Sequence, residues 1–239
     1  LLVFSSNVCA QNPDWIDWQI ETDELLELSS VAASDPEEKN FAVGDLDNDG
    51  LQDMVVGRKE PFSNSTEPPK SDLLLMNIDG VLTDRTADLA PGFLADPTFA
   101  RFVIMHDMDG DGWLDVIVAN TFLQQPKYYA NLGNNGNGDW LGLEDQSDTR
   151  FPELTGDAIL FCAVEAGDLN GDGNPDLYFV NYKQGGGTAK DFLLINDGTG
   201  NFTDESEVRL GNLRNSAFGT SVEFADMDGD GVVEIIATH

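Results

Sequence analysis

Four short acidic segments of the chain share the template D-x-D/N-x-D-G-x-x-D/E and align without gaps. Oxygen-bearing side chains stand at positions 1, 3, 5 and 9, and Gly stands at position 6 of every copy. These side chains are Asp45, Asp47, Asp49 and Asp53 in the first loop, Asp107, Asp109, Asp111 and Asp115 in the second, Asp168, Asn170, Asp172 and Asp176 in the third, and Asp226, Asp228, Asp230 and Glu234 in the fourth. The residues at position 7, whose carbonyl oxygens we expect to face the same centre, are Leu51, Trp113, Asn174 and Val232. This pattern predicts four cation sites.

The chemistry of the loops favours Ca²⁺. Side chains at positions 1, 3 and 5 converge only if the backbone curls around a centre, and Gly at position 6 permits the sharp turn that follows. Hard oxygen ligands suit Ca²⁺ better than Zn²⁺, and Mg²⁺ prefers a tight octahedron that retains several waters. Without an ion, two like charges ~4 Å apart repel by roughly 1 kcal/mol in water and by about 4 kcal/mol at an effective dielectric constant of 20. We therefore expect up to four Ca²⁺, one per loop, with binding coupled to folding.

Two other interpretations of the loops are weaker. An EF-hand or dockerin loop also begins D-x-D-x-D-G, but it has an acid at position 12 and helical flanks. Here position 12 is occupied by Val56, Val118, Phe179 or Ala237, and the flanking residues are typical of strands. The loops could instead be Asp/Gly-rich turns without metal, but four copies in register, each with Gly at the same place, argue against that.

The loops recur about every 60 residues, which indicates a repeat architecture. Each loop is entered and left through short apolar, β-branched stretches, such as RFVIM before the second loop and VIVA after it. DLLLMN and DFLLIN supply a third strand, an Asn/Gly-rich hairpin turn follows, and the weaker motif LTDRT, LEDQS or FTDES supplies a fourth. Four antiparallel strands at a fixed period predict an all-β fold, a β-propeller of stacked four-stranded blades.

Composition excludes several classes of partner. The chain has 44 Asp and Glu against 12 Lys and Arg, a net charge of −32, which argues against nucleic acid and against anionic membrane surfaces. No apolar run approaches the ~18–20 residues of a membrane span. The two Cys provide neither a disulfide framework nor a Cys-based zinc site. The apolar fraction of 41% is enough for a folded core.

The N-terminal residues 1–11 have two interpretations. They contain the apolar LLVF followed by Val8-Cys9-Ala10, which reads as the remnant of a signal peptide with a small-residue cleavage site. They are alternatively an N-terminal arm. We assign residues 12–239 to the propeller, with about four repeats and a possible truncation at the C-terminus.

The four segments 44–57, 106–119, 167–180 and 225–238 resemble the FG-GAP/VCBS repeat family, whose calcium-loop propellers also form the heads of integrin α-subunits. The resemblance extends over residues 13–239 and implies Ca²⁺ ligands at positions 1, 3, 5, 7 and 9. The chain departs from the family in three respects: Phe-Gly precedes only one loop, at Phe218-Gly219, no Gly-Ala-Pro follows any loop, and Asn170 and Glu234 replace Asp. Because the family usually closes with seven blades, we expect four repeats to be part of such a ring, or else a small ring closed by residues 13–30.

The resemblance implies a secreted or cell-surface module that serves adhesion or binds proteins or glycans. One alternative is the propeller domain of a secreted carbohydrate-active enzyme of the lyase or dehydratase type, although the sequence has no recognisable catalytic motif and only two His, His106 and His239. Another is a structural subunit of a surface filament that self-assembles through open strand edges. The four Trp residues either stack on sugars or pack between blades: Trp15, Trp18, Trp113 and Trp140.

Overall fold

The computed structural model describes residues 4–8, 16–20, 25, 38–59, 68–155, 158–182, 189–216 and 219–238. Within these ranges no helix is long and apolar enough to span a membrane. At the N-terminal end, β1 (Phe4–Val8) pairs antiparallel with β2 (Ile16–Ile20). Strand β1 lies inside residues 1–11, for which a signal-peptide remnant stays a prediction. Cys9, Trp15, Phe218 and His239 lie outside the described residues, as does the side chain of Trp18.

Three four-stranded antiparallel sheets follow one another along the chain, and in each of them every strand pairs with the next strand of the same sheet. We call these sheets blades 1, 2 and 3. Blade 1 contains β3 (Glu38–Gly44), β4 (Asp53–Arg58), β5 (Leu73–Ile78) and β6 (Val81–Asp84); blade 2 contains β7 (Ala100–His106), β8 (Asp115–Asn120), β9 (Lys127–Asn131) and β10 (Leu143–Asp145); blade 3 contains β11 (Phe161–Gly167), β12 (Asp176–Asn181), β14 (Phe192–Asn196) and β15 (Phe202–Asp204). The predicted four-stranded repeat is thereby confirmed for three of the four units.

The fourth repeat is a two-stranded sheet, blade 4, made of β17 (Ser221–Ala225) and β18 (Glu234–Thr238). A further short pair joins β13 (Ala189–Lys190) to β16 (Asn215–Ser216). The sheets of the described residues do not close into a ring. A closed propeller and its number of blades therefore stay predictions.

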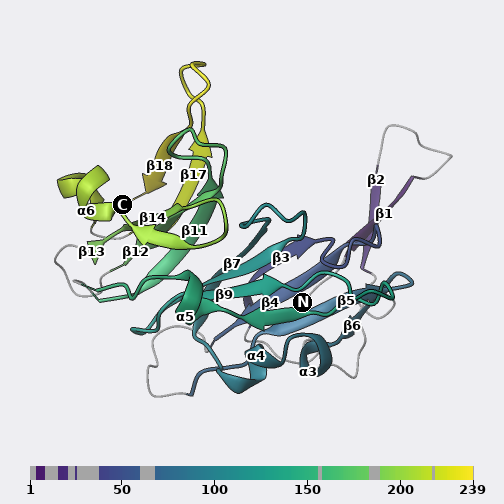
Figure 1. The fold of residues 1–239 in the computed structure, drawn as a ribbon. Coiled ribbons are helices and arrows are strands. Elements are labelled where there is room, and N and C mark those ends of the chain that lie inside the picture. The colour runs from purple at the N-terminus through teal and green to yellow at the C-terminus, as the bar shows by residue number, and fades with distance from the viewer. Residues whose placement is uncertain are drawn as a thin grey trace.

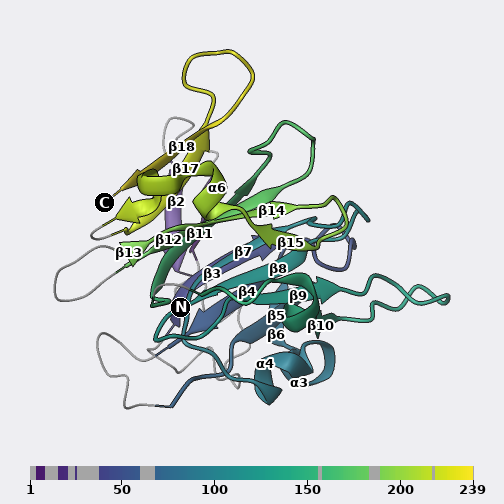
Figure 2. The same cartoon turned by 60° about the vertical axis from the view of Figure 1, so that its left-hand side comes forward.

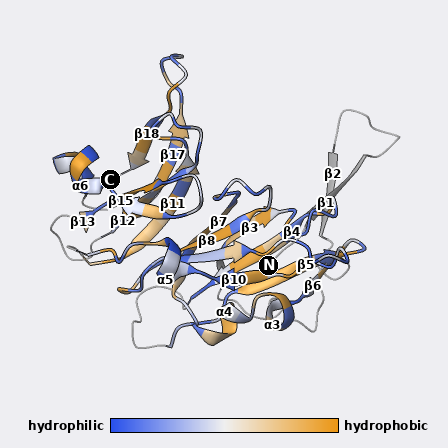
Figure 3. Cartoon of the chain, in the orientation of Figure 1, coloured by the Kyte–Doolittle hydropathy of each residue, from blue (hydrophilic) through white to orange (hydrophobic). Residues whose placement is uncertain are grey.

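The blades stack through their first strands: β3 lies against β7, β7 against β11 and β11 against β17 (Figures 1 and 2). Apolar side chains of neighbouring blades form the cores between them. Val55 of blade 1 and Tyr129 of blade 2 belong to one cluster, and Ile117 of blade 2 and Phe192 of blade 3 to another. Figure 3 shows the hydrophobic residues concentrated on the strands and the hydrophilic residues on the loops. A sheet with two apolar faces needs a neighbour on each side, which explains the stacking.

The weaker repeat motif forms a clasp at the outer edge of blades 1, 2 and 3. Oδ1 of Asp84, Asp145 and Asp204 accepts the backbone N–H and the hydroxyl of the Ser or Thr two residues later. That hydroxyl oxygen in turn accepts a backbone N–H from the third strand, as Thr86 does from Leu74 at 2.9 Å. Short helices follow the clasps: α3 (Thr86–Leu89), α4 (Pro91–Ala95), α5 (Ser147–Arg150), α6 (Ser206–Arg209) and the 3₁₀ helix η1 (Gly211–Arg214).

Candidate metal centres

Each acidic loop joins the first two strands of its blade and is closed by its own position-1 carboxylate. In the first loop the N–H of Asp49 donates to Oδ1 of Asp45 at 3.0 Å, and the N–H of Gly50 donates to Oδ2 at 2.9 Å. Asp107, Asp168 and Asp226 accept the two equivalent N–H groups in the other three loops. The position-5 carboxylate accepts the N–H of position 7 in each loop, at distances from 2.7 to 2.9 Å. All four loops therefore curl in the same way.

Two positions of every loop adopt positive φ. Gly at position 6 has φ between 88° and 93° in the four loops, as the template predicts. Position 4 is also left-handed, at Asn48, Gly110, Gly171 and Gly229, with φ from 56° to 81°. The template does not include position 4, although the restriction of this position to Asn or Gly in the four loops is the signal for a left-handed conformation.

The position-9 acid stands at the start of the second strand and ties the loop to the blade. In blade 2, Oδ2 of Asp115 accepts the N–H of Met108 at 3.1 Å, and Oδ1 accepts the N–H of Asn131 at 2.8 Å. The same two bonds occur at Asp53 and Asp176. Glu234 of the fourth loop accepts the N–H of Met227 at 2.7 Å.

Three loops gather carboxylates closely enough to share an ion. One oxygen each of Asp45, Asp47 and Asp53 lies within 4.8 Å of the others, and the same holds for Asp107, Asp109 and Asp115 and for Asp226, Asp228 and Asp230. Among the described residues of the third loop no three carboxylates converge in this way, because Asn170 replaces one of them. Position 5 of the first two loops and position 9 of the fourth lie outside these groups, and ligation of Ca²⁺ by any of the predicted residues stays a prediction.

Burial, and to a smaller extent the neighbouring charges, shift the pKa values of several loop carboxylates. Burial raises the pKa of Asp53 and of Asp115 to about 6 each, although their backbone partners oppose the change. The pKa of Asp111 is raised by burial and then by the charges of Asp109 and Asp107. In the third loop the N–H of Asn174 and the amide of Asn170 lower the pKa of Asp172 instead. The side-chain amide of Asn170 is a hydrogen-bond donor that the other three loops lack, because they have Asp at position 3.

The first and second loops each accept a hydrogen bond from the next blade along the chain. The side-chain amide of Asn131 in blade 2 donates to the carbonyl of Leu46 in the first loop at 2.8 Å, and that of Asn196 in blade 3 donates to Met108 in the second loop at 2.7 Å. Leu46 and Met108 are almost fully buried, whereas Met227, at the same position of the fourth loop, is 69% exposed. The fourth loop projects from the molecule (Figure 1).

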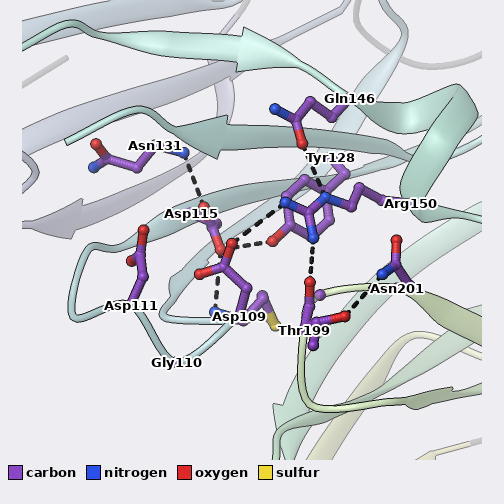
Figure 4. Close-up of polar contacts among 12 residues, drawn as sticks. Asp109, Gly110, Asp111, Asp115, Tyr128, Asn131, Gln146, Arg150, Thr199 and Asn201 are labelled. Atoms are coloured by element: carbon purple, nitrogen blue, oxygen red, sulfur yellow. Dashed lines mark hydrogen bonds and ion pairs between the residues drawn. The ribbon is translucent and has the colours of Figure 1, made fainter.

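The second loop has additional partners, which Figure 4 shows in close-up. The Tyr128 hydroxyl donates to Oδ2 of Asp115 at 2.7 Å, and Nη2 of Arg150 donates to Oδ2 of Asp109 at 3.3 Å. Arg150 ends α5, after the clasp motif LEDQS. No pattern in the sequence marked either side chain as part of the site, because both reach it only once strands and clasps are folded.

The candidate sugar-stacking residues are engaged in packing where the structure describes them. Trp113 is half-buried, and a Cβ at Gly133 would lie 3.1 Å from its ring nitrogen. The ring N–H of Trp140 donates to Oδ1 of Asn131 at 2.7 Å. His106 is exposed, and Nδ1 of its ring lies 3.1 Å from the carbonyl oxygen of Asp107.

Comparison with known protein families finds the same repeats that the structure shows. A sequence model of the FG-GAP-like repeat matches residues 45–118, 107–179 and 168–237, and each match runs from one acidic loop to the next. No curated protein matches the chain. One similar solved structure is an Agrocybe aegerita lectin, described as recognising non-reducing terminal N-acetylglucosamine, at 17% sequence identity and a TM-score of 0.43. That alignment covers 82% of this chain and 45% of the lectin chain, so this chain spans less than half of it. Because the three repeat matches together cover most of the sequence, the chain belongs to the family of proteins built from FG-GAP-like repeats.

Proposed function

We propose that the protein is an extracellular interaction module whose propeller-type blades are stabilised by Ca²⁺ in the acidic loops. The observation that carries the proposal is the convergence of three carboxylates within 4.8 Å in each of three loops of the same geometry. Such groups repel one another in the absence of a cation. An ion bound by oxygen ligands relieves that repulsion and stabilises the folded state.

The donors present fit a hard divalent cation. The three groups consist of carboxylate oxygens alone, without nitrogen or sulfur. Oδ1 of Asp109 is buried and has no hydrogen-bond partner, which is unfavourable for a charged oxygen unless another group compensates it. The residues that would hold Ca²⁺ are those at positions 1, 3, 5 and 9 of each loop, with the carbonyl at position 7. The ion would supply charge neutralisation there and rigidify the loop.

The loops are expected to differ in affinity. The first and second loops gather Asp at positions 1, 3 and 9, and the position-9 acid of each is buried. The third loop has an amide at position 3, and Asn170 already donates to Oδ2 of Asp172 at 2.8 Å. The fourth gathers three exposed Asp residues. Weaker binding is therefore expected in the third and fourth loops than in the first two.

A melting experiment on metal-stripped protein tests the calcium proposal. Each site that binds Ca²⁺ stabilises the fold by about 2.7 kcal/mol when the free ion is at ~100 times its Kd. The melting temperature should therefore rise by many degrees on adding Ca²⁺ and fall again with chelator, whereas Mg²⁺ should have a much smaller effect. Equal melting temperatures with Ca²⁺ and with chelator would contradict the proposal.

The proposed partner is a protein or glycan at the cell surface, bound by loops that the blades present. Support comes from membership of a repeat family and from a net charge of −32, which disfavours nucleic acid. Glycan-array and cell-surface binding, each measured with Ca²⁺ and with chelator, test this part. Binding that needs Ca²⁺ is the expected result. Turnover of an acidic polysaccharide would instead favour the enzyme alternative, and concentration-dependent assembly the filament.

A further inference from the structure

Arg150 is the one cation that pairs with a loop carboxylate among the described residues. Its Nη2 lies 3.3 Å from Oδ2 of Asp109, with the Arg and Asp side chains 18% and 20% exposed. Nε donates to Oε1 of Gln146 at 2.9 Å, and the guanidinium carbon lies 5.5 Å from the centre of the Tyr128 ring. These contacts fix the guanidinium beside the position-3 carboxylate of the second loop (Figure 4).

The same guanidinium reaches the next blade. Nη1 of Arg150 donates to the carbonyl oxygen of Thr199, in the turn between β14 and β15. Gly200 of this turn has φ of 75°, and a Cβ there would lie 2.8 Å from the Tyr128 hydroxyl and 2.9 Å from Nη1 of Arg150. The turn of blade 3 is therefore fitted closely against the second loop of blade 2 through Arg150.

The first and third repeats lack this arrangement within the described residues. Leu89 ends helix α3 at the position that Arg150 has in α5, and Leu74 and Leu193 take the place of Tyr128. Arg209 ends helix α6, but its Nε pairs with Oε2 of Glu205 at 2.5 Å, and both partners are partly exposed. Arg209 thus offers a matched control, because it is the same residue type at the same place in the repeat.

We propose that Arg150 is a built-in counter-cation of the second loop. In the ion-free protein it neutralises Asp109 and keeps the loop joined to the turn of blade 3. Because a positive charge beside a ligand disfavours a second cation, it also lowers the affinity of this loop for Ca²⁺. The inference rests on the proposed function, and it assigns the second loop a lower affinity than its own carboxylates would give it.

Trp113 makes the second loop separately measurable. It stands at position 7 of this loop, where the other loops have Leu51, Asn174 and Val232. Tb³⁺ prefers the same oxygen ligands as Ca²⁺, and its luminescence is excited through a nearby indole. The experiment titrates the metal-stripped chain with Tb³⁺ and then displaces the bound Tb³⁺ with Ca²⁺. Trp113→Phe, which keeps the backbone carbonyl, identifies the signal that comes from the second loop.

Arg150→Gln should lower the Ca²⁺ Kd of the second loop about tenfold, a typical coupling between two sites. It should also lower the melting temperature in chelator, so that the calcium-induced shift becomes larger. Arg150→Lys should restore the weaker affinity because it keeps the charge, and Arg209→Gln should leave the second loop unchanged. Arg150→Met serves as a second neutral variant if the Gln variant does not fold.

The outcomes separate the two proposals. If the wild-type chain binds neither Tb³⁺ nor Ca²⁺, the proposed function fails and the inference fails with it. If the wild type binds Ca²⁺ but the two neutral variants bind it with unchanged or weaker affinity, the role of Arg150 is wrong while the calcium proposal stands. A lower melting temperature in chelator without a change in affinity would mean that Arg150 is structural only.

Discussion

The second and fourth acidic loops have the same template, the same closing hydrogen bonds and similar backbone angles, but they stand in different surroundings. Asp115 of the second loop is 1% exposed and accepts hydrogen bonds from Met108, Tyr128 and Asn131. Glu234 of the fourth is partly exposed and accepts one from Met227. The difference comes from the third strand of the same blade and from the next blade, which the described part of blade 4 lacks. The loop sequence therefore sets its shape, and the surrounding strands set its burial and rigidity.

The largest effect should follow from neutralising the position-9 acid. Asp115→Asn places an amide donor where Asp115 now accepts bonds, and it should cost about 3 kcal/mol of unfolding free energy in chelator, since bonds to a charged group contribute about 1.5–3 kcal/mol each. Glu234→Gln should cost less than about 1 kcal/mol. Urea denaturation of the two variants measures both values. Equal losses would show that the surroundings of the loop do not matter.

The contacts between blades give the next comparison. Asn131→Ala should cost about 2–3 kcal/mol, because the buried amide donates to Leu46 and Leu114 and its oxygen accepts from Gly133 and Trp140. Asn77 stands at the same place in blade 1, where it is partly exposed and, among the residues that the structure describes, bonds only within its own blade. Asn77→Ala should therefore cost about 1 kcal/mol. Chemical denaturation with and without Ca²⁺ measures the loss of unfolding free energy in both variants. A loss in Asn77→Ala as large as that in Asn131→Ala would contradict a stabilising role for the hydrogen bond between Asn131 and Leu46.

A smaller effect is expected from pH. Burial raises the pKa of Asp53 and Asp115 to about 6, whereas an unfolded Asp titrates near ~3.9. Between these values the folded chain binds more protons than the unfolded chain, so lowering the pH from about 7 to about 5 should stabilise the calcium-free protein by on the order of 1 kcal/mol per group. Calcium requires the ionised carboxylates and should oppose this gain.

Melting temperatures measured across this pH range, in chelator and in Ca²⁺, check the sign. In chelator the melting temperature should rise as the pH falls, and the rise should be smaller in Ca²⁺. The Asp115→Asn variant provides the control, because it should lose part of the slope seen in chelator. A melting temperature in chelator that falls between pH 7 and pH 5 would contradict the assignment.

The shape of each acidic loop and the strands of each blade could be predicted from the sequence. The spacing of Asp45, Asp47 and Gly50 specifies how the loop curls, because these contacts lie within a few residues. The short apolar, β-branched stretches and their period indicated the four-stranded blades. The Asp-x-Ser/Thr clasp was visible as a weak motif, but its function was not, because the Ser or Thr hydroxyl binds a strand that lies earlier in the chain.

The contacts between neighbouring blades could not be predicted from the sequence. Asn131 reads as a hairpin-turn residue, yet its amide bonds to Leu46 in the preceding blade, 85 residues away. Arg150 reads as a surface residue after a short motif, yet it bridges Asp109 and Thr199. Both contacts depend on how two blades stack, and a single sequence with its own periodicity contains no direct signal for that geometry.

A crystal structure of the chain grown with Ca²⁺ would show directly whether the acidic loops hold ions. We expect anomalous difference density for an ion between Asp45, Asp47 and Asp53 and between Asp107, Asp109 and Asp115, with weaker density in the fourth loop and the least in the third. Loops that hold only water at millimolar Ca²⁺ in all four repeats would contradict the calcium proposal.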